Sequence, residues 1–535
     1  MQHEGNPEID RGDVSGSALV IFTSVLLVAG YNFSFFIHIA KIYPVTLSNI
    51  AFLISLVILI AASTILLLAP FCYKYTIKPV LILILLASSL SAYFMDSYNL
   101  VIDSTMINSA VNTNIDESLD LVNYKLVLYF VLLGILPSVF IYRARINKET
   151  VKKALFSKLL IITIAITVIV VVVMVFSKSY ASFFREHKPL RSYINPTYYL
   201  YSAGKYINST IATVHANISS IEDDSKIIAE DIDRELVIMV IGETARADRF
   251  SLNGYSRNTN PLLAKEDVIN LSEFYSCGTS TADSVPCMFS LLGHDEFSIE
   301  KAAQEENALD VLSHAGVNII WRDNNSDSKG VALRVPYVSY KNADTNSICD
   351  IECRDEGMLV GLQEYIDTHK GDILIVLHQM GNHGPAYYKR YPTSFERFSP
   401  ACRTNHLDDC SLEEINNAYD NAILYTDYFL SKVIGLLKKN DNKFETAMFY
   451  ISDHGESLGE NGLYLHGLPY FIAPDTQKHV PAILWLGKNY EIDKDDVKRV
   501  KDSKFSHDNV FHTLLGLFEI ESEVYNINMD IIHKQ

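Results

Sequence analysis

The sequence has no excess of positive charge. Its 45 lysine and arginine residues are outnumbered by 63 aspartate and glutamate residues, which gives a formal net charge of −18. All of this net negative charge falls after residue 178, because the residues before it are close to neutral. Proteins that bind nucleic acid need a basic surface for the phosphate backbone, so no nucleic-acid partner is expected. An acidic protein that acts on phosphates needs local positive charge, and a bound metal ion is the obvious source.

The sequence also lacks internal repeats and low-complexity tracts, and its first apolar run is not expected to be a cleavable signal peptide. Its first residues, MQHEGNPEIDRGD, are acidic rather than basic, and no small-residue cleavage site follows the first apolar run. The 535 residues are too many for one ordinary domain, and 49% of them are hydrophobic. Because the long apolar runs lie in the first third, we expect a membrane part followed by a soluble part.

Five apolar segments predict a transmembrane domain over residues 1–178. The third is short for a span, and the loops after the second and fourth are rich in lysine and arginine. By the positive-inside rule these two loops are cytoplasmic, which places the N-terminus inside and everything after about residue 178 outside. The segments are 17–39, 48–71, 79–95, 124–142 and 157–177.

Two further segments have two interpretations each. The long polar loop at 96–117 is either a plain solvated loop or a cover on the external face that shapes a lipid-entry site. Residues 179–235, which mix aromatic and basic side chains, form a bridge. Its helix either lies in the membrane interface or packs on the soluble domain, and composition suits both.

Cysteine is scarce, and no pair has CxxC spacing. Of the seven cysteines, Cys72 lies at the edge of a membrane segment. Close, even pairing beyond the membrane indicates short-loop disulfides and an oxidising compartment, which agrees with the orientation from loop charge. A structural zinc site or reduced thiols is the alternative. The pairs are Cys277/Cys287, Cys349/Cys353 and Cys402/Cys410.

Residues 236–535 alternate short apolar runs with helical stretches. Near-continuous apolar strands separated by helices predict a mostly parallel sheet covered on both faces, which is an α/β/α sandwich. Sites in such sheets form beyond the carboxyl ends of the strands. The strand candidates are 236–242, 317–321, 372–378, 446–452 and 480–486, and the main helix candidates are 305–316, 354–368 and 412–440.

Several of these strands run into residues that can bind metal. Glu243 follows the first strand, and Asp453 and His454 follow the fourth, while His383 and His466 lie on nearby loops. Carboxylates and imidazoles without thiolates suit zinc or manganese. Asp453 and His454 have a plainer interpretation as a helix cap. His378, at the end of the third strand, is better explained as a buried structural histidine than as a ligand.

A hydroxyl-rich turn is bracketed by Cys277 and Cys287, and a helical run follows it. A hydroxyl at a helix N-terminus is well placed to attack phosphorus once a metal activates it, although a serine and threonine N-cap is the simpler interpretation. The sequence does not distinguish its four hydroxyls, which belong to Thr279, Ser280, Thr281 and Ser284. Further along, Asn325 and Lys329 either bind a phosphate or belong to a solvated loop.

Together these segments resemble the phosphoethanolamine–lipid A transferases, a family that includes the mobile colistin-resistance enzymes and belongs to the sulfatase and alkaline-phosphatase-like superfamily. The likeness covers essentially the whole chain, in the family's order. Its motifs are VIDSTMINSAVNTN, IGETARADRFSLNGY, CGTSTADSVPCMFS, WRDNNSDSKGV, LHQMGNHGPAYYKRY, AYDNAILYTD and SDHGESLGENGLYLHG.

The resemblance implies a role for each candidate residue. Thr281 is the expected nucleophile, and one catalytic zinc is expected on Glu243, Thr281, Asp453 and His454. His383 and His466 would serve the donor phosphate, protonate a leaving group or hold a second zinc. The expected phosphoethanolamine pocket is lined by Asn325, Lys329, Glu456, His383 and His466.

The same resemblance implies transfer of phosphoethanolamine from phosphatidylethanolamine to a phosphate of lipid A, through a covalent phosphothreonine-type intermediate. The product would lower the negative charge of the outer membrane and confer resistance to polymyxins. A monomeric enzyme is expected, multi-pass in the bacterial inner membrane with its catalytic domain, 236–535, in the periplasm. The alternatives are a phosphoethanolamine or phosphoglycerol transferase with another envelope acceptor, and a non-catalytic envelope sensor that binds no zinc.

Overall fold

The computed structural model describes residues 13–533, except 72, 74, 113–120, 148–149, 178, 181–182, 184–186, 215–220, 222–224, 229–232 and 493. Cys72, two of the loop lysines (Lys74 and Lys148), part of the loop after the third span and much of the bridge therefore lie outside the described residues. The chain divides into two compact units. The first comprises 1–104 and 122–204, and the second comprises 105–121 and 205–535.

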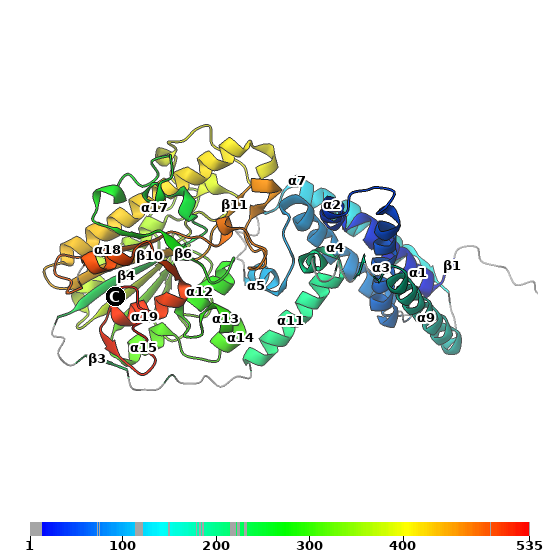
Figure 1. The fold of residues 1–535 in the computed structure, drawn as a ribbon, viewed down its shortest axis with the longest axis horizontal. Coiled ribbons are helices and arrows are strands. Elements are labelled where there is room, and N and C mark those ends of the chain that lie inside the picture. Colours follow the sequence, from blue (N-terminus) through cyan, green and yellow to red (C-terminus); the bar gives the residue numbers. More distant parts are fainter. Residues whose placement is uncertain are drawn as a thin grey trace, which may run out of the picture. The chain divides into compact units, whose positions relative to one another are not determined.

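The first unit is a bundle of apolar helices (Figure 1). Within the described residues, four helical stretches are long and apolar enough to cross a membrane, and a bent helix pair makes a fifth if it is counted as one span. The third span is longer than predicted, since helix α4 runs from Ile77 to Tyr98. The helices are α1 (Gly16–Gly30), α2 (Phe33–Ile42), α3 (Ile50–Leu68), α4, α7 (Tyr124–Tyr129), a π-helical turn (Phe130–Ile135), α8 (Leu136–Arg143) and α9 (Val151–Val175).

The first predicted span, 17–39, is broken rather than continuous. Helices α1 and α2 meet at an angle of 57° on either side of Tyr31 and Asn32. Asn32 stabilises this break because its amide donates to the carbonyls of Leu27 (2.9 Å) and Asn195 (2.8 Å) and accepts the Asn195 N–H (2.8 Å). A buried amide so satisfied can end a helix within apolar surroundings.

The bridge contains helix α11 (Thr197–Val214), which passes from the first unit into the second. Within the first unit, the buried hydroxyl of Tyr199 lies 3.2 Å from that of Ser88 on α4. The beginning of α11 therefore packs on the helical bundle, a contact that neither interpretation of the bridge anticipated.

The second unit is built on a seven-stranded sheet of order β5-β13-β10-β4-β9-β7-β8. The five strands from β10 to β8 are parallel, as predicted, whereas β13 and β5 are antiparallel at one side. The strands are β4 (Glu235–Gly242), β5 (Ile269–Leu271), β7 (Asn318–Asp323), β8 (Tyr337–Ser339), β9 (Ile373–His378), β10 (Glu445–Ser452) and β13 (Ala482–Leu486).

Helices cover both faces of this sheet (Figure 1). The long helix α17 (Leu412–Asn440) lies over one face, while α12 (Thr281–Phe289), α15 (Ala308–His314) and α19 (Val510–Gly516) lie over the other. Every residue of β4, β9 and β10 is buried, which explains why these strands are apolar on both sides rather than alternating.

The strand register places the candidate residues at one edge of the sheet. Gly242 at the end of β4 pairs with Ser452 at the end of β10, and His378 at the end of β9 pairs with Asp323 at the end of β7. Whatever follows these four strands must gather at their carboxyl ends.

Candidate active site

Glu243, Asp453 and His454 meet at this edge. Each is fully buried, and their ligand atoms all lie within 4.8 Å of one another. His454 Nε2 lies 3.6 Å from Glu243 Oε1 and 3.3 Å from Asp453 Oδ2. Because Asp453 and His454 leave β10 into an irregular segment and no helix follows them, the helix-cap interpretation is wrong.

Thr281 is the hydroxyl that faces these three residues. It is the first residue of α12, and its Oγ1 lies 3.1 Å from Glu243 Oε2 and 3.4 Å from His454 Nε2. The other hydroxyls of the turn are directed elsewhere: Thr279 donates to the Leu468 carbonyl, and Ser284 accepts the Gly278 N–H. The buried Ser280 Oγ has no hydrogen-bond partner among the described residues.

The donor set fits a divalent metal ion. His454 Nδ1 lies 2.9 Å from the Gly455 carbonyl, so this nitrogen carries the proton and Nε2 presents its lone pair. Burial lowers the pKa of His454 to about 3, which keeps the imidazole neutral. No described donor satisfies the buried Asp453 Oδ2. Two carboxylate oxygens, one imidazole nitrogen and an adjacent hydroxyl form a set typical of catalytic zinc.

The pKa shifts of the Asp453 and Glu243 carboxyls also favour a bound cation. Burial raises the pKa of Asp453 well above its usual range, and the charge of Glu243 raises it further. Burial also opposes ionisation of Glu243, but the imidazoles of His454 and His383 hold its pKa well below the usual value. A divalent cation between the two groups would let both carry their negative charge.

His383, His466 and Glu456 lie beside this cluster. The ring of His466 is 4.2 Å from that of His454 and 6.1 Å from that of His383. The fully buried Glu456 carboxylate lies 3.4 Å from His466 Nδ1 and raises the pKa of His466 against the effect of burial. Two imidazoles and a buried carboxylate therefore lie beside His454, the histidine that contacts the Thr281 hydroxyl.

The structure brings Asn325 into contact with Glu243, a candidate metal ligand. The buried Asn325 amide donates to Glu243 Oε2 at 2.7 Å and to the Gln379 carbonyl at 2.8 Å, so it fixes the orientation of the Glu243 carboxylate. Lys329 does not share this contact, since its ammonium donates to the carbonyl (3.0 Å) and hydroxyl (2.8 Å) of Ser326. Direct phosphate binding by either residue stays a prediction.

His378 lies outside the cluster, as expected for a structural histidine. It is fully buried, and its Nδ1 is 2.9 Å from Asp323 Oδ2. The loop after it approaches Glu243 so closely that a Cβ on Gly381, which has φ of +50°, would lie 2.8 Å from the Glu243 carbonyl. Only glycine allows this approach.

One residue of the site has no sequence signal. His507 begins a short 3-10 turn (His507–Asn509) and is fully buried. Its Nδ1 accepts the Cys277 N–H at 3.1 Å, so the proton is on Nε2, which donates to the Ser452 carbonyl at 3.1 Å. His507 thus ties the turn that carries Thr281 to the end of β10. A lone histidine 54 residues after Asp453 gives no hint of this role.

All three predicted disulfides are present, Cys277–Cys287, Cys349–Cys353 and Cys402–Cys410. The first closes the turn that presents Thr281.

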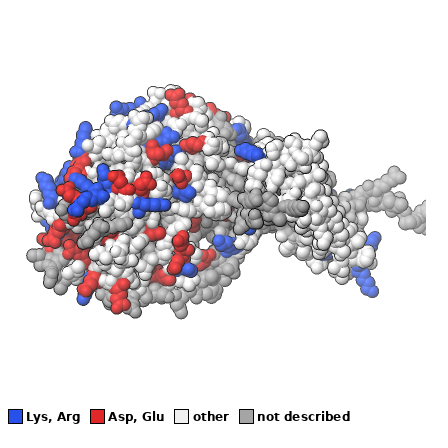
Figure 2. All heavy atoms as spheres, in the orientation of Figure 1, with Lys and Arg blue, Asp and Glu red and all other residues white. Residues whose placement is uncertain are grey.

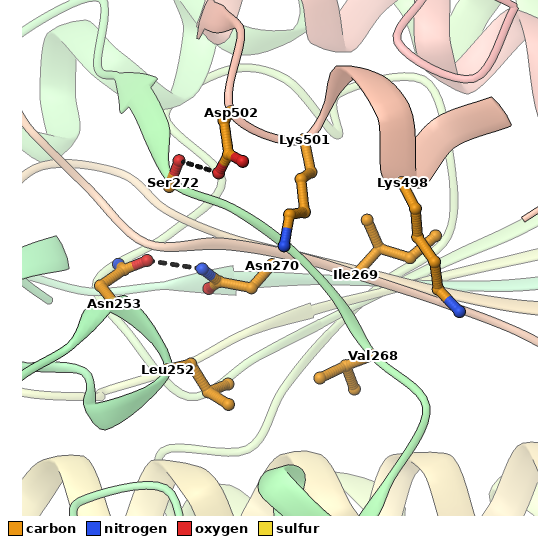
Figure 3. Close-up of a pocket in the computed structure, with 9 residues that line it drawn as sticks. All are labelled: Leu252, Asn253, Val268, Ile269, Asn270, Ser272, Lys498, Lys501 and Asp502. Atoms are coloured by element: carbon orange, nitrogen blue, oxygen red, sulfur yellow. Dashed lines mark hydrogen bonds between the residues drawn. The ribbon is translucent and has the colours of Figure 1, made fainter. Parts of the chain in front are cut away.

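A hollow of about 380 Å³ lies elsewhere, beside edge strand β5, where Asn253 forms a hydrogen bond with Asn270 and Ser272 forms one with Asp502 (Figure 3). No candidate site residue lines this hollow, so it is separate from the cluster of Glu243, Asp453 and His454.

Two family models match the chain. Residues 235–520 match the sulfatase model, and residues 59–211 match the model of the phosphoethanolamine transferases EptA and EptB. Among curated proteins, phosphatidylethanolamine transferase Mcr-1 of Escherichia coli is 44% identical over 532 residues, which is 96% of each chain. Phosphoethanolamine transferase EptA of Escherichia coli strain K12 is 37% identical and covers 96% of this chain and 97% of its own.

A solved structure resembles the whole chain. It is the integral membrane lipooligosaccharide phosphoethanolamine transferase A of Neisseria meningitidis, with a TM-score of 0.92 and 33% identity, covering 97% of this chain and 99% of that one. The match confirms the predicted architecture of N-terminal transmembrane helices followed by an alkaline-phosphatase-like α/β/α domain.

Proposed function

The chain belongs to the phosphoethanolamine transferase family, and from this premise we propose that it transfers phosphoethanolamine from phosphatidylethanolamine to a phosphate group of lipid A. The observation that carries the proposal is the meeting of Thr281 with Glu243, Asp453 and His454 at one edge of the sheet. A hydroxyl at a helix N-terminus beside a buried metal-ligand set is what phosphoryl transfer through a covalent intermediate requires.

Zinc is the proposed metal, held by Glu243, Asp453, His454 and the Thr281 oxygen. When bound, it would lower the pKa of the Thr281 hydroxyl and stabilise negative charge on the phosphoryl oxygens. A second zinc on His383 and His466 is a further proposal that the donor types allow.

In the first half-reaction, Thr281 Oγ forms a bond to the phosphorus of phosphatidylethanolamine while the bond from phosphorus to the diacylglycerol oxygen breaks. Glu243, 3.1 Å from Thr281 Oγ1, accepts the hydroxyl proton. His466 lies beside His454, and His383 lies beside His466, so we propose that one of these two histidines donates a proton to the departing diacylglycerol oxygen. Asn325 keeps the Glu243 carboxylate directed at Thr281 throughout.

In the second half-reaction, an oxygen of a lipid A phosphate attacks the phosphoethanolamine on Thr281, and the bond from phosphorus to Thr281 Oγ breaks. Glu243 returns the proton to Thr281 Oγ, and the histidine that protonated diacylglycerol takes up the proton of the acceptor phosphate, so the site returns to its starting state. Because the two substrates use one site in turn, ping-pong kinetics are expected. The product carries an added ammonium group, so the lipid is less negative and binds polymyxins less tightly.

The setting follows from the architecture. We propose that residues 1–178 anchor the enzyme in the bacterial inner membrane, that 179–235 form the bridge, and that 236–535 form the periplasmic catalytic domain. The orientation is supported by the basic loops on one side and by the three disulfides beyond the last span. We propose that it acts as a monomer, without nucleic acid.

Mass spectrometry of lipid A from Gram-negative cells tests the reaction, the acceptor class and the nucleophile together. Wild type should add phosphoethanolamine to lipid A, and Thr281→Ala should add none while retaining its fold. Ser280→Ala is the matched control, since it removes a neighbouring hydroxyl that bonds to no described residue and should keep activity.

Two other outcomes would change the conclusion. Full activity of Thr281→Ala would refute the assignment of the nucleophile. Release of diacylglycerol from phosphatidylethanolamine without any lipid A adduct would support phosphatidylethanolamine as the donor and would mean that the acceptor is another envelope component.

A further inference from the structure

A lysine lies on the bundle-facing side of helix α9. Lys158 is only 7% exposed, and Ile161 and Ala165, three and seven residues further on, are buried beside it on the same helix face. That spacing defines the stripe of α9 that packs against the other helices. Charged residues on the inner face of a membrane helix are expensive, so each one calls for a specific partner.

This ammonium has no anionic partner in the part of the chain that the structure describes. Among the residues that the structure describes, none accepts a hydrogen bond from Lys158 Nζ, and its one close contact is the ring of Tyr73, whose centroid is 3.0 Å away. Lys78 differs, because its ammonium donates to the Tyr142 carbonyl at 2.8 Å. A cation–π contact offsets only part of the free energy that burying a cation costs.

Contacts within the helical unit fix the depth of Lys158. Ser17 at the start of α1 bonds the neighbouring Ser157 at 2.7 Å, and a Cβ on Gly16 would lie 3.4 Å from Ile77 at the start of α4. Lys158 therefore lies near the end of the bundle where these helices begin. Tyr73, 59% exposed, is at the same end, and exposed tyrosines are typical of the lipid headgroup level.

The surface around this end is basic. Arg143, Arg145, Lys152 and Lys153 are all exposed there. In Figure 2 the visible surface of the helical unit is mostly white, and a group of blue side chains stands out at its lower right. Basic pockets between transmembrane helices on the cytoplasmic side bind the headgroups of anionic lipids.

From these observations we propose that Lys158 binds the phosphodiester of an anionic phospholipid in the cytoplasmic leaflet. The lipid phosphate supplies the missing anion, and the Tyr73 ring covers another side of the ammonium. The exposed arginine and lysine residues raise the local concentration of anionic lipid. This site is independent of phosphoethanolamine transfer, whose proposed residues all lie in the other unit.

Native mass spectrometry of the full-length, delipidated protein tests the proposal with phosphatidylglycerol and phosphatidylcholine of identical acyl chains, since phosphatidylcholine is zwitterionic and is not the proposed donor. Wild type should bind phosphatidylglycerol at least about fivefold more tightly than phosphatidylcholine, the factor expected for one lysine at a lipid surface. Lys158→Met should remove that difference. Lys158→Arg should keep it, and so should Lys153→Met, which removes an exposed lysine at the same end.

Three results would overturn the proposal. The first is that Lys158→Met binds phosphatidylglycerol as tightly as the wild type does. The second is equal binding of the two lipids by the wild type. The third is displacement of phosphatidylglycerol by millimolar inorganic phosphate, which would make free phosphate the ligand. If Lys158→Met does not fold, Tyr73→Leu serves instead: weaker phosphatidylglycerol binding supports the site, and unchanged binding refutes it.

Discussion

Replacing His507 with phenylalanine should lower kcat for phosphoethanolamine transfer by at least about tenfold. The substitution keeps a buried ring but removes the acceptor for Cys277 N–H and the donor to the Ser452 carbonyl, both at 3.1 Å. These bonds link the turn that carries Thr281 to the strand that carries the metal-ligand pair. A misplacement of the nucleophile by an ångström is enough to cost about a hundredfold in rate.

The magnitude follows from the two bonds. Each buried backbone group left without a partner costs about 1–3 kcal/mol, so loss of both bonds should lower the free energy of unfolding by roughly 2–6 kcal/mol. If the misplaced turn also reduces stabilisation of the transition state by about 1.4 kcal/mol, kcat falls about tenfold. Burial lowers the pKa of His507 to about 3, so the neutral ring holds both bonds across the physiological range and the defect should not depend on pH between 6 and 8.

The assay is release of diacylglycerol from fluorescent phosphatidylethanolamine by the purified full-length enzyme, with zinc content and Tm measured in parallel. A positioning role predicts lower kcat with nearly unchanged KM and zinc content, and partial rescue by His507→Gln, whose amide can make both bonds. His512→Phe is the matched control, because His512 is also buried but accepts Asn526 N–H instead. If His507→Phe and His512→Phe lost the same Tm and both kept wild-type kcat, His507 would be merely structural.

Three further predictions concern the metal, the nucleophile turn and pH. Asp453→Asn keeps the side-chain volume but removes a ligand charge, so zinc content measured by plasma mass spectrometry should fall at least about tenfold; stoichiometric zinc would remove Asp453 from the ligand set. Replacing Cys277 and Cys287 together with alanine opens the loop that presents the nucleophile and should cost about 2–4 kcal/mol of stability as well as kcat; unchanged Tm and turnover would leave this disulfide without a role. Burial, and then the charge of Glu491, raise the pKa of Glu445 to about 7. The folded protein therefore binds this proton more tightly than the unfolded chain does. The stability that comes from the bound proton is lost as pH rises through about 7. Glu445→Gln should raise Tm at pH 8 by about 2 °C and leave it unchanged at pH 5 in thermal melts, and an equal shift at both would contradict this reasoning.

Much of the molecule could be predicted because its signals are local. The membrane helices follow from apolar runs, and the parallel strands follow from short apolar runs that are buried on both faces. The disulfides follow from cysteines 4 to 10 residues apart, which can reach each other within one turn or loop. Loop charge fixes the expected orientation without reference to any fold.

Other features were decided by packing. The bend between α1 and α2 depends on Asn32 meeting Asn195, and no local pattern marks that pair. Strand β13 looks like its parallel neighbours in sequence, yet it pairs antiparallel with β10 because strand direction depends on how the chain returns to the sheet.

The sequence by itself determined which residue types gather at the candidate site, since Glu243, Asp453 and His454 follow strands whose carboxyl ends can be recognised. Only the tertiary structure decided which of four hydroxyls faces these candidate ligands, that Asn325 holds Glu243, and that His507 joins the turn carrying Thr281 to β10. The physical reason is the separation along the sequence over which each kind of interaction acts. Periodicity and turn chemistry act over a few residues, whereas these contacts join residues 38 to 230 positions apart and exist only once the sheet register is set.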